Sequence, residues 1–334
     1  MKKHRIIAKS FPMRAQIQGR INAEVFDGIE IFVMEDAIAN PAKYKELLNF
    51  ARDNFPSVNL ETFHEINIGN KPRSFGIIDS RQSVREKSRQ LLETTISLNK
   101  GMGNITTHFV GTSLDVEVSR SWIHSPEEQV AMLGEYLQQF NQVVSVENII
   151  SFESETSEKR RFAFNVGCTV KDFTTLWNTY KIPMTLDTAH SAISLAQFSR
   201  IAAKGYLYSD NKTRKNRIPF PEEQIELGRE VNKSGLTDTW MDQVKQLPSG
   251  SIKNIHFING RLDEKDNYTD GYAELSPEQG RLLDLNKVLN YLSQGDDAGH
   301  IVTEVAENLY SSNPDFEAVP HMARMARALK EKSI

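Results

Sequence analysis

The stretch IPMTLDTAH, residues 182–190, joins a short apolar run to two polar side chains that can bind a cation. A short, continuous apolar run is typical of a strand that is buried on both faces, as in a parallel sheet. The run ends in Asp187, and His190 follows three residues later. We therefore interpret it as a buried strand with a carboxylate and an imidazole at its C-terminal end.

Similar apolar runs recur along the chain, and segments with helical periodicity separate them. The other seven runs are His4–Phe11, Gly28–Met34, Val58–Ile66, Ile105–Gly111, Asn148–Phe152, Ile252–Ile258 and His300–Val305. Helices are predicted over residues 42–55, 81–99, 127–144, 170–180, 285–293 and 318–332. Strands that alternate with helices indicate parallel βαβ units. Eight such units in 334 residues predict an α/β fold, the (β/α)8 TIM barrel.

A doubly wound open sheet is the alternative fold, and it usually has a glycine-rich turn after its first strand. Here the first run continues as SFPMRAQ, residues 10–16, and the sequence has no GxGxxG motif and no P-loop. We therefore expect a single barrel domain over residues 1–334. The sixty residues between His190 and Ile252 exceed what one helix needs, so they contain an insertion at about 205–248. The insertion is either a surface elaboration or a lid over the barrel mouth.

The amino-acid composition limits the classes of protein to which the chain can belong. A hydrophobic content of 39% and a charged content of 25% fit a soluble globular protein. The single cysteine, Cys168, excludes an intramolecular disulfide and favours a reducing compartment. The sequence has neither the apolar core of a signal peptide nor a membrane-spanning run. We expect a cytoplasmic protein without a membrane partner, and the net charge of −4 does not indicate a nucleic-acid partner.

Polar residues that can ligate a metal lie near the ends of seven of the runs. In chain order they are Glu35, His64, His108, Glu153, Asp187 with His190, His256 and Glu304. A TIM barrel brings the C-terminal ends of its strands together at one mouth. Carboxylates and imidazoles in such a pocket require a cation, and this donor set suits one divalent ion such as Mn, Co, Mg or Zn.

The order of these residues resembles the xylose isomerase-like TIM barrel superfamily. The motifs that carry the resemblance are SFES at Glu153, LDTAH at Asp187 and His190, NIHFING at His256 and TEVAE at Glu304. The resemblance spans residues 4 to about 330. It implies a metal-dependent isomerase or epimerase that moves a proton next to the carbonyl of a sugar or a sugar-like compound through an enediolate.

The resemblance also implies roles for individual residues. The metal ligands would be Glu153, Asp187, His256 and Glu304, and the two glutamates would also transfer protons. His190 would contact a substrate oxygen, and Arg261 resembles the basic residue that the family has on the same loop. Further substrate contacts are predicted at His108, Glu35, His64 and Trp122. The partner would be a small-molecule substrate, and barrels of this kind often pair as homo-oligomers.

The superfamily also contains DNA-repair enzymes of the endonuclease IV type, which use three zinc ions. That alternative needs histidines in strands three and four, for which His64 and His108 are available, and an Asp-x-His after strand seven. The closest match to the last requirement is Asp270-Gly271-Tyr272, where a phenol replaces the imidazole. A zinc-dependent phosphodiesterase therefore stays the alternative function, together with a barrel that has lost its chemistry.

Overall fold

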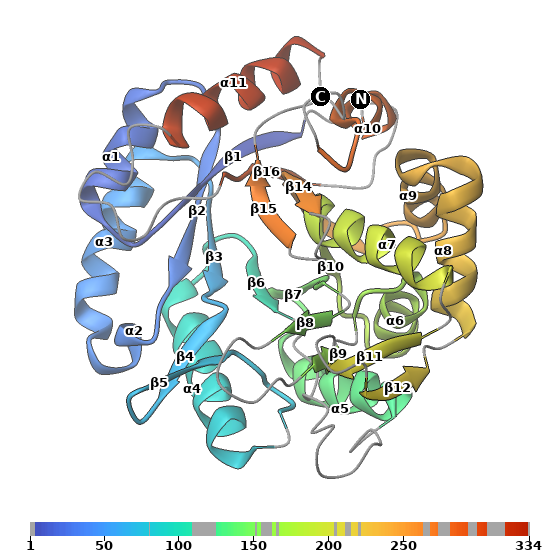
Figure 1. The fold of residues 1–334 in the computed structure, drawn as a ribbon. Helices are drawn as coiled ribbons and strands as arrows, with labels where there is room; N and C mark the ends of the chain where they lie inside the picture. Colours follow the sequence, from blue (N-terminus) through green and yellow to red (C-terminus); the bar gives the residue numbers. More distant parts are fainter. Residues whose placement is uncertain are drawn as a thin grey trace.

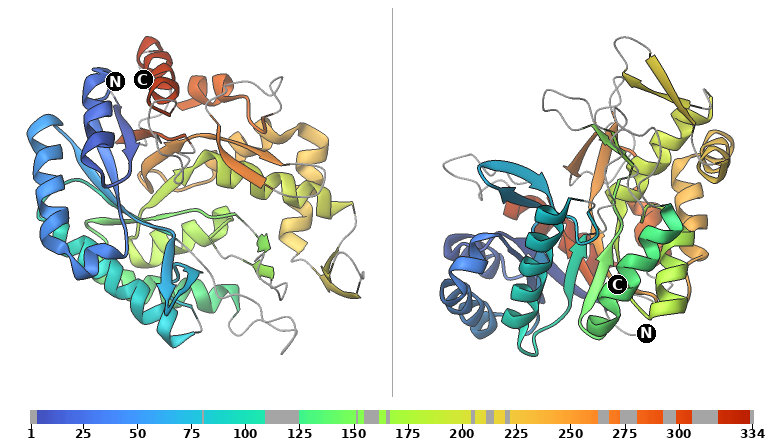
Figure 2. Two further views of the ribbon diagram at one scale, coloured as in Figure 1. Left: turned by 60° about the vertical axis from the view of Figure 1, so that its left-hand side comes forward. Right: turned by 90° about the horizontal axis from the view of Figure 1, so that it is seen from below.

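In the computed structural model, eight parallel strands close into a barrel in the order β1-β16-β13-β10-β7-β6-β3-β2. The strands are β1 (Arg5–Ser10), β2 (Gly28–Val33), β3 (Val58–Thr62), β6 (Ile105–His108), β7 (Val144–Glu147), β10 (Met184–Asp187), β13 (Ile252–Phe257) and β16 (His300–Thr303). Helices surround them on the outside (Figures 1 and 2). The prediction of a (β/α)8 TIM barrel is confirmed.

The structure describes residues 4–79, 81–108, 125–150, 152–154, 162–164, 167–203, 206–210, 215–219, 222–262, 268–272, 281–292, 299–305 and 318–332. No helix within these ranges combines the length and the apolar character that a membrane span requires.

The described part of the chain contains helices outside the barrel, and those predicted over residues 42–55, 81–99, 170–180, 285–293 and 318–332 are among them, with bounds close to the predicted ones. The helices are α1 (Arg14–Asn22), α2 (Asp36–Ala39), α3 (Pro41–Asn54), α4 (Gln82–Asn99), α5 (Pro126–Leu137), α6 (Val170–Thr175), α7 (Thr188–Ala202), α8 (Glu222–Ser234), α9 (Leu236–Lys245), α10 (Leu285–Leu292) and α11 (Ala318–Glu331), with the short turns η1 (Gln138–Phe140) and η2 (Leu176–Tyr180). At the start of α5, the Ser125 hydroxyl accepts a hydrogen bond from Glu128 N, and the Glu128 carboxylate accepts one from Ser125 N. This capping box satisfies two backbone donors at the helix start.

Four antiparallel hairpins extend from the barrel. They are β4 (Glu65–Ile68) with β5 (Lys71–Ser74), β8 (Phe152–Ser154) with β9 (Phe162–Phe164), β11 (Tyr206–Asp210) with β12 (Lys215–Pro219), and β14 (Asn259–Leu262) with β15 (Tyr268–Tyr272). Three of them follow the C-terminal ends of β3, β7 and β13. The predicted insertion at 205–248 contains the hairpin β11–β12 and the helices α8 and α9, and α8 packs against α7 (Figure 1). Its role as a lid stays a prediction.

The fifth barrel strand lies earlier in the chain than the sequence predicts. It is β7, Val144–Glu147, whereas the predicted run Asn148–Phe152 begins only after it. The helix predicted up to residue 144 instead ends at Leu137, because the β-branched residues around Val144 favour a strand. Asn148 ends the barrel strand, since its side chain accepts a hydrogen bond from Asp187 N and donates one to Asp187 O.

The barrel strands place apolar side chains outward and polar side chains inward. In β10, Met184 and Leu186 line a cavity outside the barrel, and Thr185 and Asp187 lie on the opposite face. A buried polar layer fills the barrel interior toward the N-terminal ends of the strands, which we call the lower end. Its members are Asn59, Thr106, Ser145, Thr185 and Asn254. The Thr185 hydroxyl lies 2.6 Å from Ser145 Oγ and 3.1 Å from Thr106 Oγ1. Hydroxyls that satisfy one another can support charged groups in the layer above.

This layer gives a prediction for stability. Thr185→Val keeps the shape of the side chain but removes one hydrogen-bond partner from each of the hydroxyls of Ser145 and Thr106. We expect the free energy of unfolding to fall by about 1–3 kcal/mol, measured by urea denaturation. The control is Thr175→Val, because the Thr175 hydroxyl is bonded to Lys171 O at an exposed position where water can replace it. Equal effects of the two substitutions would contradict the role of the layer.

Candidate metal centre

A layer of ionisable side chains lies directly above the polar layer, and all eight strands contribute to it. Its members are Lys9 (β1), Glu30 (β2), Glu61 (β3), His108 (β6), Glu147 (β7), Asp187 (β10), His256 (β13) and Glu304, which follows β16. All of them are buried except Glu304, whose side chain is 23% exposed. Charged groups at this depth are tolerated only when opposite charges or a bound cation compensate them.

His256 lies at the centre of this layer and has carboxylates on both sides of its ring. Its Nδ1 atom is 3.3 Å from Glu147 Oε2 and 3.6 Å from Glu304 Oε2. On the opposite side, its Nε2 atom is 2.9 Å from Glu30 Oε1 and 3.6 Å from Glu61 Oε2. Neither nitrogen has a hydrogen bond of acceptable geometry within the described part of the chain, although the ring is fully buried.

Four of these residues carry atoms that could ligate one metal ion. We call these residues the quartet: Glu147, Asp187, His256 and Glu304. Atoms of Asp187, His256 and Glu304 lie within 4.8 Å of one another, and so do atoms of Glu147, Asp187 and His190. The buried atoms Glu147 Oε2 and His256 Nδ1 have no hydrogen-bond partner among the described residues. Three carboxylates and one imidazole are ligands that a divalent cation such as Mn²⁺ or Zn²⁺ accepts. The quartet therefore fits the divalent ion that the sequence predicts.

Two pKa shifts indicate that carboxylates outnumber positively charged groups at the centre. Burial and the nearby Glu147 and Glu304 raise the pKa of Asp187 to about 7, although His190 acts against them. Burial and Lys9 lower the pKa of His256, but Glu147 and Glu30 outweigh them and raise it to about 10. Without an ion, the centre therefore holds protons where a metal would supply positive charge.

Metal binding should consequently release protons. Asp187, with a pKa of about 7, and His256, with a pKa of about 10, must both be deprotonated before they ligate an ion. A rise in pH therefore favours binding. We expect about one proton per ion to be released between pH 7 and 10, and about two below pH 7. Calorimetric titration of Mn²⁺ in buffers of different ionisation enthalpy measures this number, and an affinity that does not change with pH across this range would contradict the assignment.

Two further histidines, His190 and His108, lie close to the quartet, and a third, His64, contacts His108. His190 Nδ1 lies 3.2 Å from Glu147 Oε1 and 3.0 Å from Asn148 O. His108 Nε2 lies 3.2 Å from Glu61 Oε1, and its Nδ1 lies 3.7 Å from Glu147 Oε2. The exposed His64 ring packs edge-on against the His108 ring, with centroids 6.1 Å apart. Burial lowers the pKa of His108, and Lys9, His190 and His256 lower it further against Glu147, so His108 favours its neutral form.

The other predicted site residues lie elsewhere. Glu153 is part of β8, a hairpin strand that pairs with β9 and not with the barrel, so its predicted place at the end of barrel strand five is wrong. The residue at the end of barrel strand five is Glu147. Glu35 accepts hydrogen bonds from Asn67 and lies 2.5 Å from Lys87 Nζ, in a hollow beyond the ends of β1 to β3. Arg261 is exposed on β14, and Trp122 lies outside the described residues.

Four members of the charged layer are not among the site residues predicted from the sequence: Lys9, Glu30, Glu61 and Glu147. Lys9, Glu30 and Glu61 lie inside apolar runs rather than at their ends. Since both faces of a parallel barrel strand are covered, a charge inside such a run must face the barrel interior. That pattern was readable in GIEIFV, residues 28–33, where Glu30 lies between two isoleucines.

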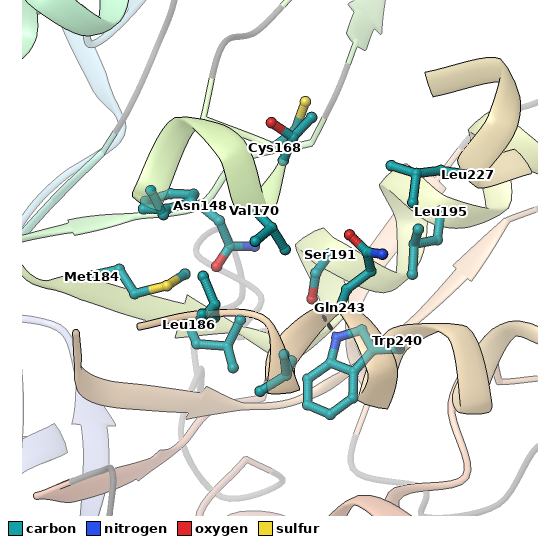
Figure 3. Close-up of a pocket in the computed structure, with 14 residues that line it drawn as sticks. Asn148, Cys168, Val170, Met184, Leu186, Ser191, Leu195, Leu227, Trp240 and Gln243 are labelled. Atoms are coloured by element: carbon teal, nitrogen blue, oxygen red, sulfur yellow. Dashed lines mark hydrogen bonds between the residues drawn. The ribbon is translucent and has the colours of Figure 1, made fainter. Parts of the chain in front are cut away.

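A second cavity lies outside the barrel, between β10 and the helices α6, α7 and α9 (Figure 3). Its lining is mainly apolar and includes Met184, Leu186, Leu195 and Trp240, whose indole N–H donates a hydrogen bond to Ser191 Oγ. Its volume of about 50 Å³ is far below that of small-molecule sites, which hold about 300–1,000 Å³. The cavity is therefore too small to be the substrate site.

Two solved structures are similar to this chain over almost its whole length. Endonuclease IV from Thermus thermophilus is 13% identical, with a TM-score of 0.50 and coverage of 98% of this chain and 99% of that chain. A xylose isomerase domain containing protein from Salmonella typhimurium is 10% identical, with a TM-score of 0.52 and coverage of 99% and 98%. No protein-family model matches the sequence, and no curated protein does. The chain has a TIM-barrel fold similar to that of these two structures.

Proposed function

We propose that the protein is a divalent-metal-dependent isomerase or epimerase that transfers a proton next to the carbonyl of a sugar or a sugar-like compound. The observation that supports it is the pair of carboxylates at His256 Nδ1, Glu147 at 3.3 Å and Glu304 at 3.6 Å. The two glutamates come from β7 and from the end of β16, which are separated by β10 and β13 in the barrel. Carboxylates that approach one centre from two sides are what proton removal and return require.

The residues of the quartet would have different roles, according to how far their side chains are exposed to solvent. Glu304, whose side chain is 23% exposed, can reach a substrate at the barrel mouth and would remove the proton. Glu147 would take the role predicted for Glu153, as a buried metal ligand that also returns the proton. A divalent ion bound by the quartet would supply the Lewis acidity that stabilises the developing enediolate.

His190 and Asp187 would orient the substrate oxygens and the ion. Asp187 Oδ1 accepts a hydrogen bond from His190 N at 2.6 Å, which fixes the first turn of α7 against the centre. His190 is partly exposed, and its Nδ1 atom lies 3.0 Å from the backbone oxygen of Asn148, which orients the ring beside the centre. Groups held on a strand end and a helix start keep their geometry when substrate binds.

Hydrogen exchange at carbon tests this function without knowledge of the physiological sugar. The protein is incubated with Mn²⁺ and a panel of aldoses and ketoses, with and without phosphate groups, in D2O. Proton transfer next to the carbonyl incorporates deuterium at that carbon, which NMR detects. We expect incorporation in at least one substrate and its loss when EDTA is added. No exchange in any substrate of the panel would count against the proposal.

A zinc-dependent phosphodiesterase is the second candidate, and one observation favours it. His108 Nε2 and Glu147 Oε2 are both buried without a hydrogen-bond partner among the described residues, and Glu61, His108 and Glu147 form a further group of potential ligands. A centre with more than one ion suits phosphoryl chemistry. Cleavage of DNA with an abasic site, together with no deuterium exchange in any sugar, would favour this function.

A further inference from the structure

The ammonium group of Lys9 is buried within the charged layer, next to His256. Lys9 Nζ lies 2.9 Å from Glu30 Oε1 and 3.5 Å from Glu304 Oε2, and it also forms an ion pair with Glu61. The Lys9 side chain is 5% exposed, and those of Glu30 and Glu61 are 0% and 3% exposed. An ammonium group with two buried carboxylates is retained only because each charge compensates the others.

The carboxylates around Lys9 belong to a group of potential metal ligands. Atoms of Glu30, Glu61 and His256 lie within 4.8 Å of one another. His256 contributes Nε2, which is fully buried and has no hydrogen-bond partner among the described residues. Three ligands of this kind, from three barrel strands, would hold a divalent ion if the space between the carboxylates were free.

We propose that the ammonium of Lys9 takes the place of a second metal ion in this chain. It neutralises Glu30 and Glu61 and keeps an ion away from His256 Nε2, so that His256 uses Nδ1 for the ion of the quartet. This inference depends on the proposed metal centre in one respect only, which is the number of ions expected in the unaltered chain. The added claim, that Lys9 occupies a metal-capable position, stands on the Lys9 contacts alone.

Two observations indicate that Lys9 is fixed in this position. Its ammonium lies 4.5 Å from the centroid of the Phe32 ring, at the distance of a cation–π contact. Phe32 packs with Phe11 and Phe63 in one cluster, and each of the three lies two residues beyond a charged residue of the same strand run. Since alternate residues of a strand share a face, this cluster covers the Lys9 side of the charged layer. The cluster would hold the ammonium between the carboxylates.

Metal counting in Lys9→Met tests the proposal. Mn²⁺ bound per chain is measured by equilibrium dialysis in the unaltered protein, in Lys9→Met and in the double variant Lys9→Met/Glu61→Gln. We expect Lys9→Met to bind one equivalent more than the unaltered protein, because the vacated space exposes three ligands. The double variant should lose the added equivalent. Lys253→Met is the matched control, since Lys253 is exposed on β13, and it should leave the count unchanged.

The outcomes separate this inference from the proposed function. An unchanged count in Lys9→Met would overturn the inference, whatever the unaltered protein binds. If the unaltered protein binds no Mn²⁺ while Lys9→Met binds one, the inference stands and the proposed metal centre is wrong. If both proteins bind the same single ion, the metal centre stands and the inference is wrong.

Thermal unfolding covers the case in which Lys9→Met folds poorly. Without metal, two buried carboxylates would face each other, and we expect the melting temperature to fall by about 5–15 °C. Saturating Mn²⁺ should restore most of that loss in Lys9→Met and add nothing comparable in the double variant. A Lys9→Met protein that stays unfolded in Mn²⁺ while the double variant folds would also overturn the inference, because the ion would then be unable to replace the ammonium.

Discussion

His256→Ala should lose the bound ion and all measurable turnover. The substitution removes the only nitrogen ligand of the quartet, whose Nδ1 atom has carboxylates at 3.3 and 3.6 Å. Loss of an outer partner of a ligand alone lowers metal affinity by about 10–100-fold. We therefore expect the affinity for Mn²⁺ to fall by more than about 100-fold, measured by isothermal titration, and deuterium exchange into substrate to reach background.

A second interior histidine provides the control. His300 starts β16 at the opposite end of the barrel and contacts the amide of Asn59 at 3.1 Å. His300→Ala removes an imidazole from the barrel without removing a member of the charged layer. Unchanged metal affinity in His300→Ala would assign the loss in His256→Ala to the quartet. Full metal affinity in His256→Ala would show that the ion binds elsewhere.

Glu304→Gln should separate proton transfer from metal binding. Gln keeps the size of the side chain and an oxygen that can ligate weakly, but it cannot accept the proton. A positioned general base contributes about 10²–10⁴-fold to the rate. We expect kcat to fall within that range at saturating Mn²⁺ while the bound ion is retained, measured by deuterium exchange.

The matched control for this prediction is Glu93→Gln. Glu93 accepts a hydrogen bond from the Tyr136 hydroxyl at an exposed position on α4, outside the barrel. Its substitution should leave exchange unchanged. If Glu304→Gln exchanged deuterium at the original rate with full metal occupancy, Glu304 would be only a ligand, and the proton would have to leave through another group.

The part of the site that the sequence predicts best is the segment from Asp187 to His190. An apolar run that ends in a carboxylate at the start of a helix needs no long-range information to interpret, because Asp187 both ends β10 and caps α7. His256 and Glu304 were found in the same way, since they lie close to the ends of recognisable runs.

The predicted place of Glu153 at the end of barrel strand five was wrong because two local signals compete before it. Residues 143–146 read as VVSV, which favours a strand, but they follow directly after a strong helical pattern. The helix ends at Leu137, and the strand is complete by Glu147. A shift of a few residues in a short strand changes which carboxylate enters the barrel, and only pairing with β6 and β10 fixes it.

Lys9, Glu30 and Glu61 were not predicted from the sequence for a different reason. A charged residue inside an apolar run is a weak signal by itself, because its partner comes from another strand. Lys9 is 21 residues from Glu30 and 52 residues from Glu61 along the chain, and they meet only when the barrel closes. The fold was therefore predictable from repeated local patterns, whereas the pairing of buried charges required the closed barrel.

Anomalous diffraction from crystals soaked in Zn²⁺ tests the central claim most directly. Zn²⁺ binds nitrogen and oxygen ligands more tightly than Mn²⁺, and its ligands lie at about 2.0–2.2 Å. We expect an anomalous peak at this distance from His256 Nδ1 and from carboxylate oxygens of Glu147, Asp187 and Glu304. Crystals that show no peak in contact with His256, or only a peak at surface residues, would contradict the assignment of the quartet as the metal centre.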